Sequence, residues 1–318
     1  MQSTFTQEID FRQERDFGAK ISATFEFLKA HWRPLGKCFV YFVLPAALLM
    51  GVGMGLFTNA TWNQLANAKN GVPTVQPAFS VLGIALIVLG GLSAMILLLG
   101  TLYGYISLRM ALPPEQTVTP RLVWKNIVAK LGRVFLGFLL VGAVFGVMVL
   151  GLGFLLMKIH PMMSIPVMFI FMYLFVPLTL FYPLLWLEDD NVISALQRSF
   201  RLTYGHWWST FGLYMVISIL QVLLVFVFAL PQYAVLIGKM MKVPGLESDV
   251  LGVIAQCIYV MGLMVTYAIP LTALVFQYFN LVEKREGWGM YLQVEALGQT
   301  NAPIVANTYY RADDEGEY

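Results

Sequence analysis

Charged residues are scarce in this 318-residue sequence. Lys, Arg, Asp and Glu make up 12% of the chain, whereas hydrophobic residues make up 58%. A soluble domain usually carries about twice that charged share, so the composition excludes a soluble globular protein, and the apolar excess excludes a disordered one. The net charge of +2 offers no basic field for nucleic acid. The sequence therefore predicts an integral membrane protein with no nucleic-acid partner.

Residues that carry chemistry are also rare. Cys38 and Cys257 both lie in apolar stretches and predict neither a disulfide framework nor a metal site. The histidines, His31, His160 and His206, have no second ligand at metal-binding spacing. We therefore expect no catalytic residues, no metal and no cofactor, and hence no enzyme. Roughly 35 polar and mixed residues precede the first long apolar run, so no signal peptide is expected.

Six long apolar stretches contain no charged residue between their ends. A helix needs roughly 20 apolar residues to cross the hydrocarbon core of a bilayer. The stretches predict spans at about residues 38–57, 79–108, 134–157, 162–187, 211–238 and 250–281. The predicted fold is all-α, with three helical hairpins in a membrane domain at residues 18–285, an N-terminal segment at 1–17 and a polar, acidic tail at 286–318.

The basic residues favour one orientation of these spans. Sixteen of the 20 Lys and Arg residues lie before the first span, between the second and third, between the fourth and fifth, or in the tail. Since cytoplasmic loops carry the excess of Lys and Arg, we expect a multi-pass protein of the bacterial inner membrane with both termini in the cytoplasm.

An amphipathic stretch precedes each predicted hairpin, at about residues 18–33, 120–133 and 191–206. Each has an apolar stripe at helical spacing, with Lys and Arg largely off that stripe. The stripes are Ile21, Phe25, Leu28 and Trp32; Trp124, Val128, Leu131 and Phe135; and Ile193, Leu196, Phe200 and Thr203. This pattern predicts helices that lie flat at the membrane surface and bind anionic lipid. The residues expected to contact headgroups are Lys29, Arg33, Lys125, Lys130, Arg198, Arg201, Trp32, Trp207 and Trp208.

The first and third amphipathic stretches share residues as well as pattern. Both begin with Ile-Ser-Ala, at Ile21 and Ile193, and both reach a His-Trp pair, at His31 and His206. We interpret the chain as three units, each an amphipathic helix followed by a hairpin. All three would enter from the same side, as parallel repeats about an axis along the membrane normal.

The stretch from Asn191 to Gly212 carries a family resemblance. It reads Ala195-Leu-Gln-Arg198-Ser-Phe200-Arg-Leu202 and continues through His206-Trp207-Trp208 to Gly212. This motif resembles one in the membrane domain found fused to bacterial glycerophosphoryl diester phosphodiesterases. The resemblance implies a six-span membrane scaffold. It implies no phosphodiesterase activity, because that activity belongs to a separate soluble barrel for which this chain has no segment.

Polar residues inside the spans are few. Gln221 and Gln256, with Tyr182, could line a polar cavity, or the two glutamines could simply hydrogen bond between helices. The acidic run at residues 188–190 could form a cation or acid–base site, but helix capping is the interpretation we favour. Two small-xxx-small patterns, Gly100 with Gly104 and Gly142 with Gly146, predict close helix packing.

Two functions remain open from the sequence. The first is a non-catalytic inner-membrane protein, either a scaffold or assembly factor or a lipid-associated component of the envelope. Its partners would be anionic lipids, together with another membrane protein or a second copy of the chain. The alternative is a transporter or permease subunit for a neutral or lipidic substrate.

Overall fold

The computed structural model describes residues 5–69, 77–158, 164–188, 191–246 and 248–289, together with Tyr291 and Val294. Over these residues the chain is helical and forms no strand. The helices are α1 (Glu8–Phe11), α2 (Phe17–Cys38), η1 (Phe39–Val43), α3 (Leu44–Lys69), α4 (Pro77–Ala111), α5 (Pro120–Lys158), α6 (Ser164–Leu187), α7 (Val192–Thr203), α8 (Trp207–Met241), α9 (Asp249–Thr266) and α10 (Ala268–Glu286).

Six helical segments are long and apolar enough to cross a membrane. They are Phe17–Gln64, Ser80–Ala111, Pro120–Gly151, Met168–Leu187, Trp207–Met241 and Asp249–Glu286. The predicted fold class, an all-α multi-span membrane protein, is therefore confirmed.

Two of the predicted amphipathic stretches continue directly into the next span. The stretch at 120–133 and the span at 134–157 form the single helix α5. Helix α2 likewise continues into α3 through the wide turn η1, in which the Leu44 amide bonds to the Phe39 carbonyl. Pro45 accounts for the wide turn, because it has no N–H and its ring displaces the preceding carbonyl of Tyr41.

Helix breaks separate the third amphipathic helix from its span and divide the sixth span. Helix α7 ends at Thr203, and Gly205 adopts a φ of +80° before α8 begins, a conformation that glycine adopts without strain. The sixth span is split at Tyr267 into α9 and α10. Pro270 explains this break, since it cannot donate to the Thr266 carbonyl one turn earlier.

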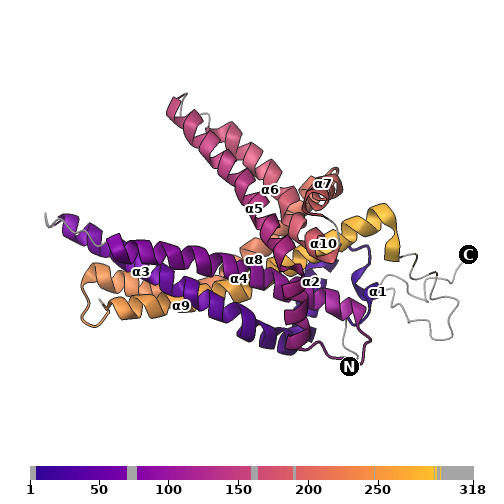
Figure 1. Ribbon diagram of the computed structural model, residues 1–318, viewed down its shortest axis with the longest axis horizontal. Coiled ribbons are helices and arrows are strands. Elements are labelled where there is room, and N and C mark those ends of the chain that lie inside the picture. Colours follow the sequence, from indigo (N-terminus) through magenta and orange to yellow (C-terminus); the bar gives the residue numbers. More distant parts are fainter. Residues whose placement is uncertain are drawn as a thin grey trace, which may run out of the picture.

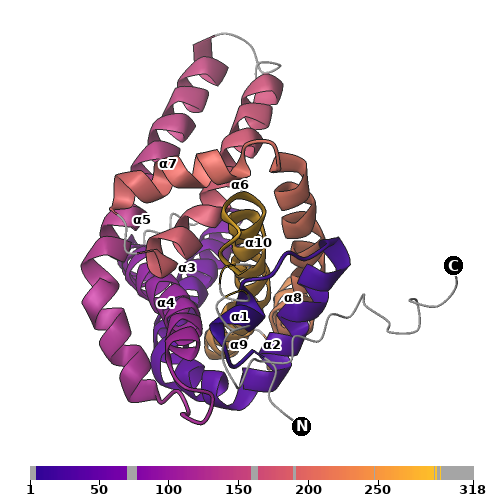
Figure 2. The same cartoon turned by 90° about the vertical axis from the view of Figure 1, so that its right-hand side faces the viewer.

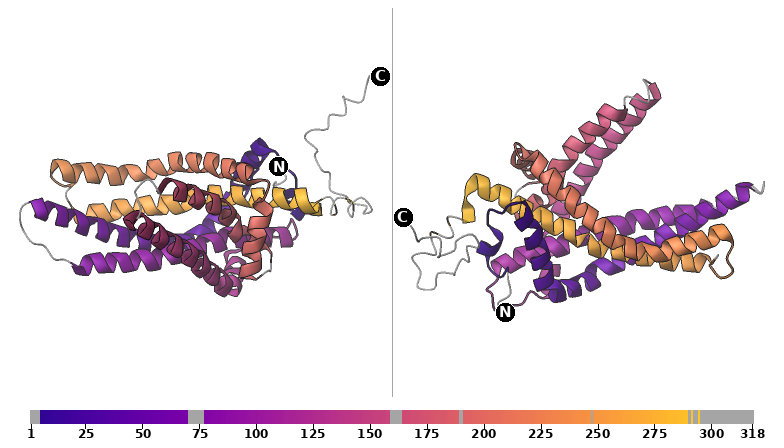
Figure 3. Two further views of the ribbon diagram at one scale, coloured as in Figure 1. Left: turned by 90° about the horizontal axis from the view of Figure 1, so that it is seen from above. Right: turned by 180° about the vertical axis from the view of Figure 1, so that it is seen from behind.

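The spans form two diverging arms. Helix α3 packs against α4 and α9, and α9 packs against α8, which together make a four-helix arm. The hairpin of α5 and α6 points away from this arm (Figure 1), and the view from behind shows the same divergence (Figure 3). The first and third predicted hairpins therefore pack together, whereas the second projects by itself.

Glycines allow the close packing of the four-helix arm. A Cβ at Gly51 would lie 2.7 Å from the Cα of Cys257 on α9, and one at Gly53 would lie 2.7 Å from the Ile87 amide nitrogen on α4. Helix α3 thus meets a neighbouring backbone on two opposite sides. A Cβ at Gly142 or Gly146 of α5, by contrast, would meet nothing within 4 Å. The small-xxx-small pattern at those two residues makes no close helix contact in this structure.

The two arms meet in a region that we call the hub, formed by α1, α2, α7 and α10 with the adjoining ends of the other helices. Helix α10 lies at its centre, with α2, α7 and α8 around it (Figure 2). Every residue from Ala268 to Val282 is buried. Because α10 contacts α2, α4, α6, α7, α8 and α9, it connects both arms.

The N-terminal segment is part of the hub. Phe5, Ile9 and Phe11 are buried, and the ring of Phe11 stacks on that of Phe276 at 6.2 Å. The guanidinium of Arg15 lies over the Phe276 ring at 5.1 Å, and the Arg15 amide donates to Asn280 Oδ1 at 2.8 Å. Residues 5–16 therefore pack onto α10, a contact that the sequence did not suggest.

Candidate functional site

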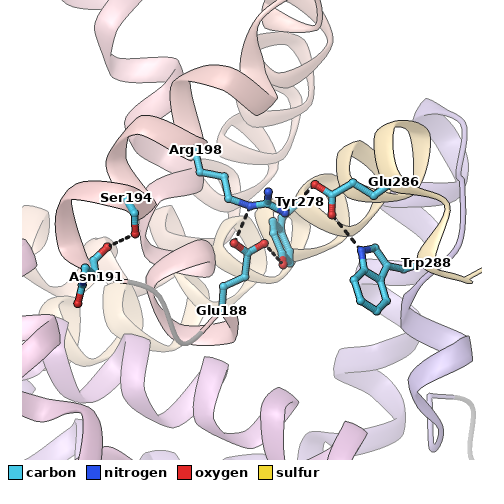
Figure 4. Close-up of polar contacts among 7 residues, drawn as sticks. All are labelled: Glu188, Asn191, Ser194, Arg198, Tyr278, Glu286 and Trp288. Carbon is cyan, nitrogen blue, oxygen red and sulfur yellow. Dashed lines mark hydrogen bonds and ion pairs between the residues drawn. The ribbon is translucent and has the colours of Figure 1, made fainter.

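A polar network connects the end of α6 with α7 and α10 in the hub (Figure 4). Arg198 of α7 pairs through Nε with Glu188 Oε2 at 2.6 Å and through Nη2 with Glu286 Oε1 at 2.8 Å. The hydroxyl of Tyr278 donates to Glu188 Oε1 at 2.8 Å. We call Glu188, Arg198, Tyr278 and Glu286 the Arg198 network.

The side chains of the network are partly buried. The side chains of Glu188, Arg198 and Glu286 are 20%, 19% and 29% exposed. Burial alone would lower the pKa of the Arg198 guanidinium, but the carboxylates of Glu188 and Glu286 outweigh it and raise the pKa. The guanidinium therefore stays charged and joins three helices instead of exchanging protons.

Helix α7 begins four residues after Glu188. Asn191 is its N-cap residue, but the Asn191 side chain makes no capping bond. The Ser194 hydroxyl donates to the Asn191 carbonyl at 2.9 Å instead (Figure 4). Of the acidic run at residues 188–190, Glu188 serves as an ion-pair partner and not as a cap, and residues 189 and 190 lie outside the described residues.

Most of the residues expected to contact headgroups are exposed. These are Lys29, Trp32 and Arg33 of α2, Lys125 of α5, Arg201 of α7 and Trp208 of α8. The other three have partners within the protein. Lys130 Nζ donates to the Trp186 carbonyl at 2.7 Å, Trp207 Nε1 donates to the Tyr173 carbonyl at 3.1 Å, and Arg198 belongs to the network above. Lipid contact at all nine remains a prediction.

The amphipathic helices α2 and α5 share one orientation. In α2, Ile21 and Leu28 of the predicted apolar stripe are half-buried, and the other two residues of the stripe are exposed. Phe25 and Trp32 of its predicted apolar stripe are 40% and 67% exposed. The stripe displaced by one residue, namely Lys20, Thr24, Phe27 and His31, is buried instead.

Helix α5 has the same displacement. Its predicted stripe is exposed, with Trp124 at 45%, while Val123, Ile127 and Val134 are buried. One residue corresponds to about 100° around a helix, so α2 and α5 turn apolar side chains outward and bury the adjacent face. In α7 only Ile193 of the predicted stripe is exposed, at 66%, whereas Leu196 packs on the core and Thr203 is buried.

The glutamines of the predicted polar cavity do not meet. Gln221 Nε2 lies 3.4 Å from Thr266 Oγ1, and Gln256 Nε2 lies 3.7 Å from Met54 Sδ. Because Gln256 and Thr266 are ten residues apart on α9, the two glutamines lie about 15 Å apart along the helix axis. Tyr182 packs its ring against Phe138 at 4.9 Å, on the α5–α6 hairpin. The contacts of the glutamines are between helices, and the three residues do not form one site.

Buried charged residues in the hub were missed by the sequence analysis. Lys20 is only 3% exposed, and its Nζ donates to Gln277 Oε1 at 2.8 Å. Gln277 Nε2 in turn donates to Thr210 Oγ1 at 2.9 Å. Arg109, 5% exposed, donates to the carbonyls of Gln116 at 2.6 Å and Pro113 at 2.8 Å. These contacts join α2, α8 and α10 and close the end of α4.

The part of the chain that the structure describes offers no candidate metal site. It contains no group of three or more His, Cys, Asp or Glu side chains placed to hold a metal ion. His31 is buried and stacks on Phe27 at 4.8 Å.

Comparisons with known proteins identify no related protein. No family model, no curated protein and no solved structure matches this chain. The resemblance to the phosphodiesterase membrane domain therefore remains a prediction that rests on the motif alone.

Proposed function

We propose that this chain is a non-catalytic, lipid-associated scaffold of a bacterial inner membrane, with its hub on the cytoplasmic side. The observation that carries the proposal is the common orientation of α2 and α5. Both turn large apolar side chains outward while the adjacent stripe packs on the protein, and Ile193 of α7 is exposed in the same way. A helix exposes an apolar stripe in this way where lipid covers it.

Basic residues accompany the outward stripes and supply the lipid selectivity. On α2, Phe25, Lys29 and Trp32 share one exposed face, since they are four and three residues apart. Aromatic side chains of this kind sit at the headgroup level, and each nearby Lys or Arg contributes about 1 kcal/mol of attraction to an anionic leaflet. The proposed ligand is therefore the anionic phospholipid headgroup.

The hub supports the scaffold part of the proposal. The Arg198 network and the contacts of Lys20 tie α2, α6, α7, α8 and α10 to one another through side chains that leave no free acid–base group within them. These contacts join the helices from which both arms extend. The transporter alternative lacks comparable support, because Gln221 and Gln256 contact different helices.

Reconstitution into nanodiscs tests the proposal. The purified protein is placed in nanodiscs of phosphatidylethanolamine with or without phosphatidylglycerol. The protein is then released from the nanodiscs, and the lipids that remain bound to it are measured by native mass spectrometry. We expect the wild type to retain phosphatidylglycerol preferentially. The combined Lys29→Gln, Arg33→Gln, Lys125→Gln and Arg201→Gln variant should lose most of that preference. Lys242→Gln, an exposed residue beyond the far end of α8, is the matched control and should keep it. An unchanged preference in the combined variant would contradict the proposal.

A further inference from the structure

Buried hydrogen-bonding atoms without a protein partner occur on three neighbouring helices. They are Oγ1 of Thr101 and the hydroxyl of Tyr103 on α4, Oδ1 of Asn126 on α5 and Nε1 of Trp186 on α6. Trp186 is 1% exposed. Because buried polar groups in folded proteins nearly always have a partner in the protein or in ordered water, two such atoms near one point indicate a bound water or ligand.

Two of these atoms lie near the same glycine of α4. A Cβ at Gly100 would lie 3.1 Å from Cη2 of Trp186, so the indole lies along the glycine face of α4. A Cβ at Gly104 would lie 3.7 Å from Trp186 Nε1 and 3.8 Å from Asn126 Oδ1. The two polar atoms thus flank the point above Gly104, and neither bonds to the other.

The base of the second hairpin holds both atoms in place. One turn beyond Asn126, Lys130 Nζ donates to the backbone carbonyl of Trp186 at 2.7 Å. On the other side, Ile127 packs its Cγ1 within 3.0 Å of the Cβ position of Gly100. Helices α4, α5 and α6 therefore fix the donor and the acceptor relative to each other.

We propose that a hydroxyl oxygen binds above Gly104, between Trp186 Nε1 and Asn126 Oδ1. The indole N–H needs an acceptor and the amide oxygen needs a donor, and a hydroxyl group is both. A metal cation cannot accept from the indole, and a phosphate or carboxylate oxygen cannot donate to the amide. The hydroxyl comes from water or from the headgroup of a glycerol-bearing lipid. The site is independent of the lipid contacts proposed for the exposed faces.

Indole ¹⁵N NMR tests this site on the full chain. The Trp186 signal is assigned by its loss in Trp186→Phe. We expect it at a downfield, hydrogen-bonded position, with a cross-peak to water in phospholipid-free micelles if water is the occupant. A downfield shift seen only in phosphatidylglycerol nanodiscs, with a cross-peak to glycerol protons, identifies the lipid. A signal at the free indole position in both media would overturn the proposal.

A substitution at Gly104 supplies the matched comparison. Gly104→Ala places a methyl group at ordinary contact distance from both atoms, so it should displace the hydroxyl without a clash and move the Trp186 signal upfield. Gly142→Ala, where the methyl meets open space, should leave the signal in place. Asn126→Leu removes the acceptor and should repeat the upfield shift. If neither variant moves the signal, the indole has another partner and the proposal is wrong.

Discussion

At the scale of residues, the hub depends on charged side chains that have few alternatives to their present partners. Arg198 pairs with two carboxylates, and Lys20 bonds to an amide inside the protein. Removing one partner of such a buried or half-buried pair leaves the other without compensation, which costs more than the pair itself contributes. Both contacts can therefore be tested by single substitutions.

Arg198→Met should loosen the docking of α7. The carboxylates of Glu188 and Glu286, 20% and 29% exposed, would then face each other without a cation. We expect a loss of about 2 kcal/mol, between the values for exposed and fully buried pairs, measured by denaturant unfolding in micelles. Arg201→Met, at an exposed position of the same helix, is the control. Equal stability of the two variants would contradict this role.

Gln277→Leu should be more damaging than the double variant Lys20→Met with Gln277→Leu. The single change leaves the buried Lys20 ammonium without its hydrogen-bond partner, at a cost of about 3 kcal/mol. The double change replaces both polar groups with apolar ones and should recover most of that loss. A double-mutant cycle on thermal unfolding measures the difference, and simple additivity of the two single losses would rule out the proposed pairing.

Sequence reasoning could not identify these buried residues, for a physical reason. In water the apolar stripe of an amphipathic helix marks the face that packs on protein. At a membrane, lipid accepts the apolar stripe, and the protein can receive the more polar face. Phe25 and Trp32 therefore lie outside while Lys20 and Thr24 lie inside. The spacing identifies an apolar stripe, but it carries no information on which side of the helix meets protein.

At the scale of elements, close contact between helices decides where the spans pack. Helix α3 meets the backbones of α4 and α9 through Gly51, Gly53 and Gly55. In α5, Gly142, Gly146 and Gly151 meet nothing within 4 Å. The same residue type is thus a packing surface in α3 and unpartnered at these three positions of α5.

Gly51→Ala should destabilise the four-helix arm, because the new Cβ would lie 2.7 Å from the Cα of Cys257 and a backbone has to move. Overpacking of this kind costs about 1–3 kcal/mol. Gly142→Ala should be neutral or slightly stabilising, since alanine favours helix. Melting temperatures in micelles compare the two. A larger drop for Gly142→Ala would show that the α3–α9 contact is not the close one.

The six-span, all-α fold was predictable because uncharged length is sufficient to identify a membrane helix. The breaks were not. The turn η1 and the division at Tyr267 depend on Pro45 and Pro270, yet Pro34, Pro177 and Pro231 lie within continuous helices. Whether a proline bends or breaks a helix depends on what its neighbours offer to the freed carbonyl, which a single sequence does not contain.

At the scale of the whole molecule, the three predicted repeats are alike near the hub and unlike beyond it. Helices α2, α5 and α7 bury equivalent stripes, whereas the α5–α6 hairpin alone diverges from the bundle (Figure 1). The repeat pattern predicts three units but not how the units pack together, because their packing depends on contacts between units, such as that of Gly51 with Cys257. Far from the hub, Lys239 pairs with Asp249 at 2.8 Å and ties α8 to α9.

The central claim is that the hub and its basic, aromatic faces lie on the cytoplasmic side of a bacterial inner membrane. Cysteine labelling in intact cells tests it directly, because the native Cys38 and Cys257 are buried. Lys242→Cys and Lys29→Cys both place a thiol at an exposed position, beyond the far end of α8 and in the hub respectively. With a membrane-impermeant maleimide, we expect Lys242→Cys to react in intact cells and Lys29→Cys to react only after permeabilisation. Labelling of Lys29→Cys in intact cells would contradict the account.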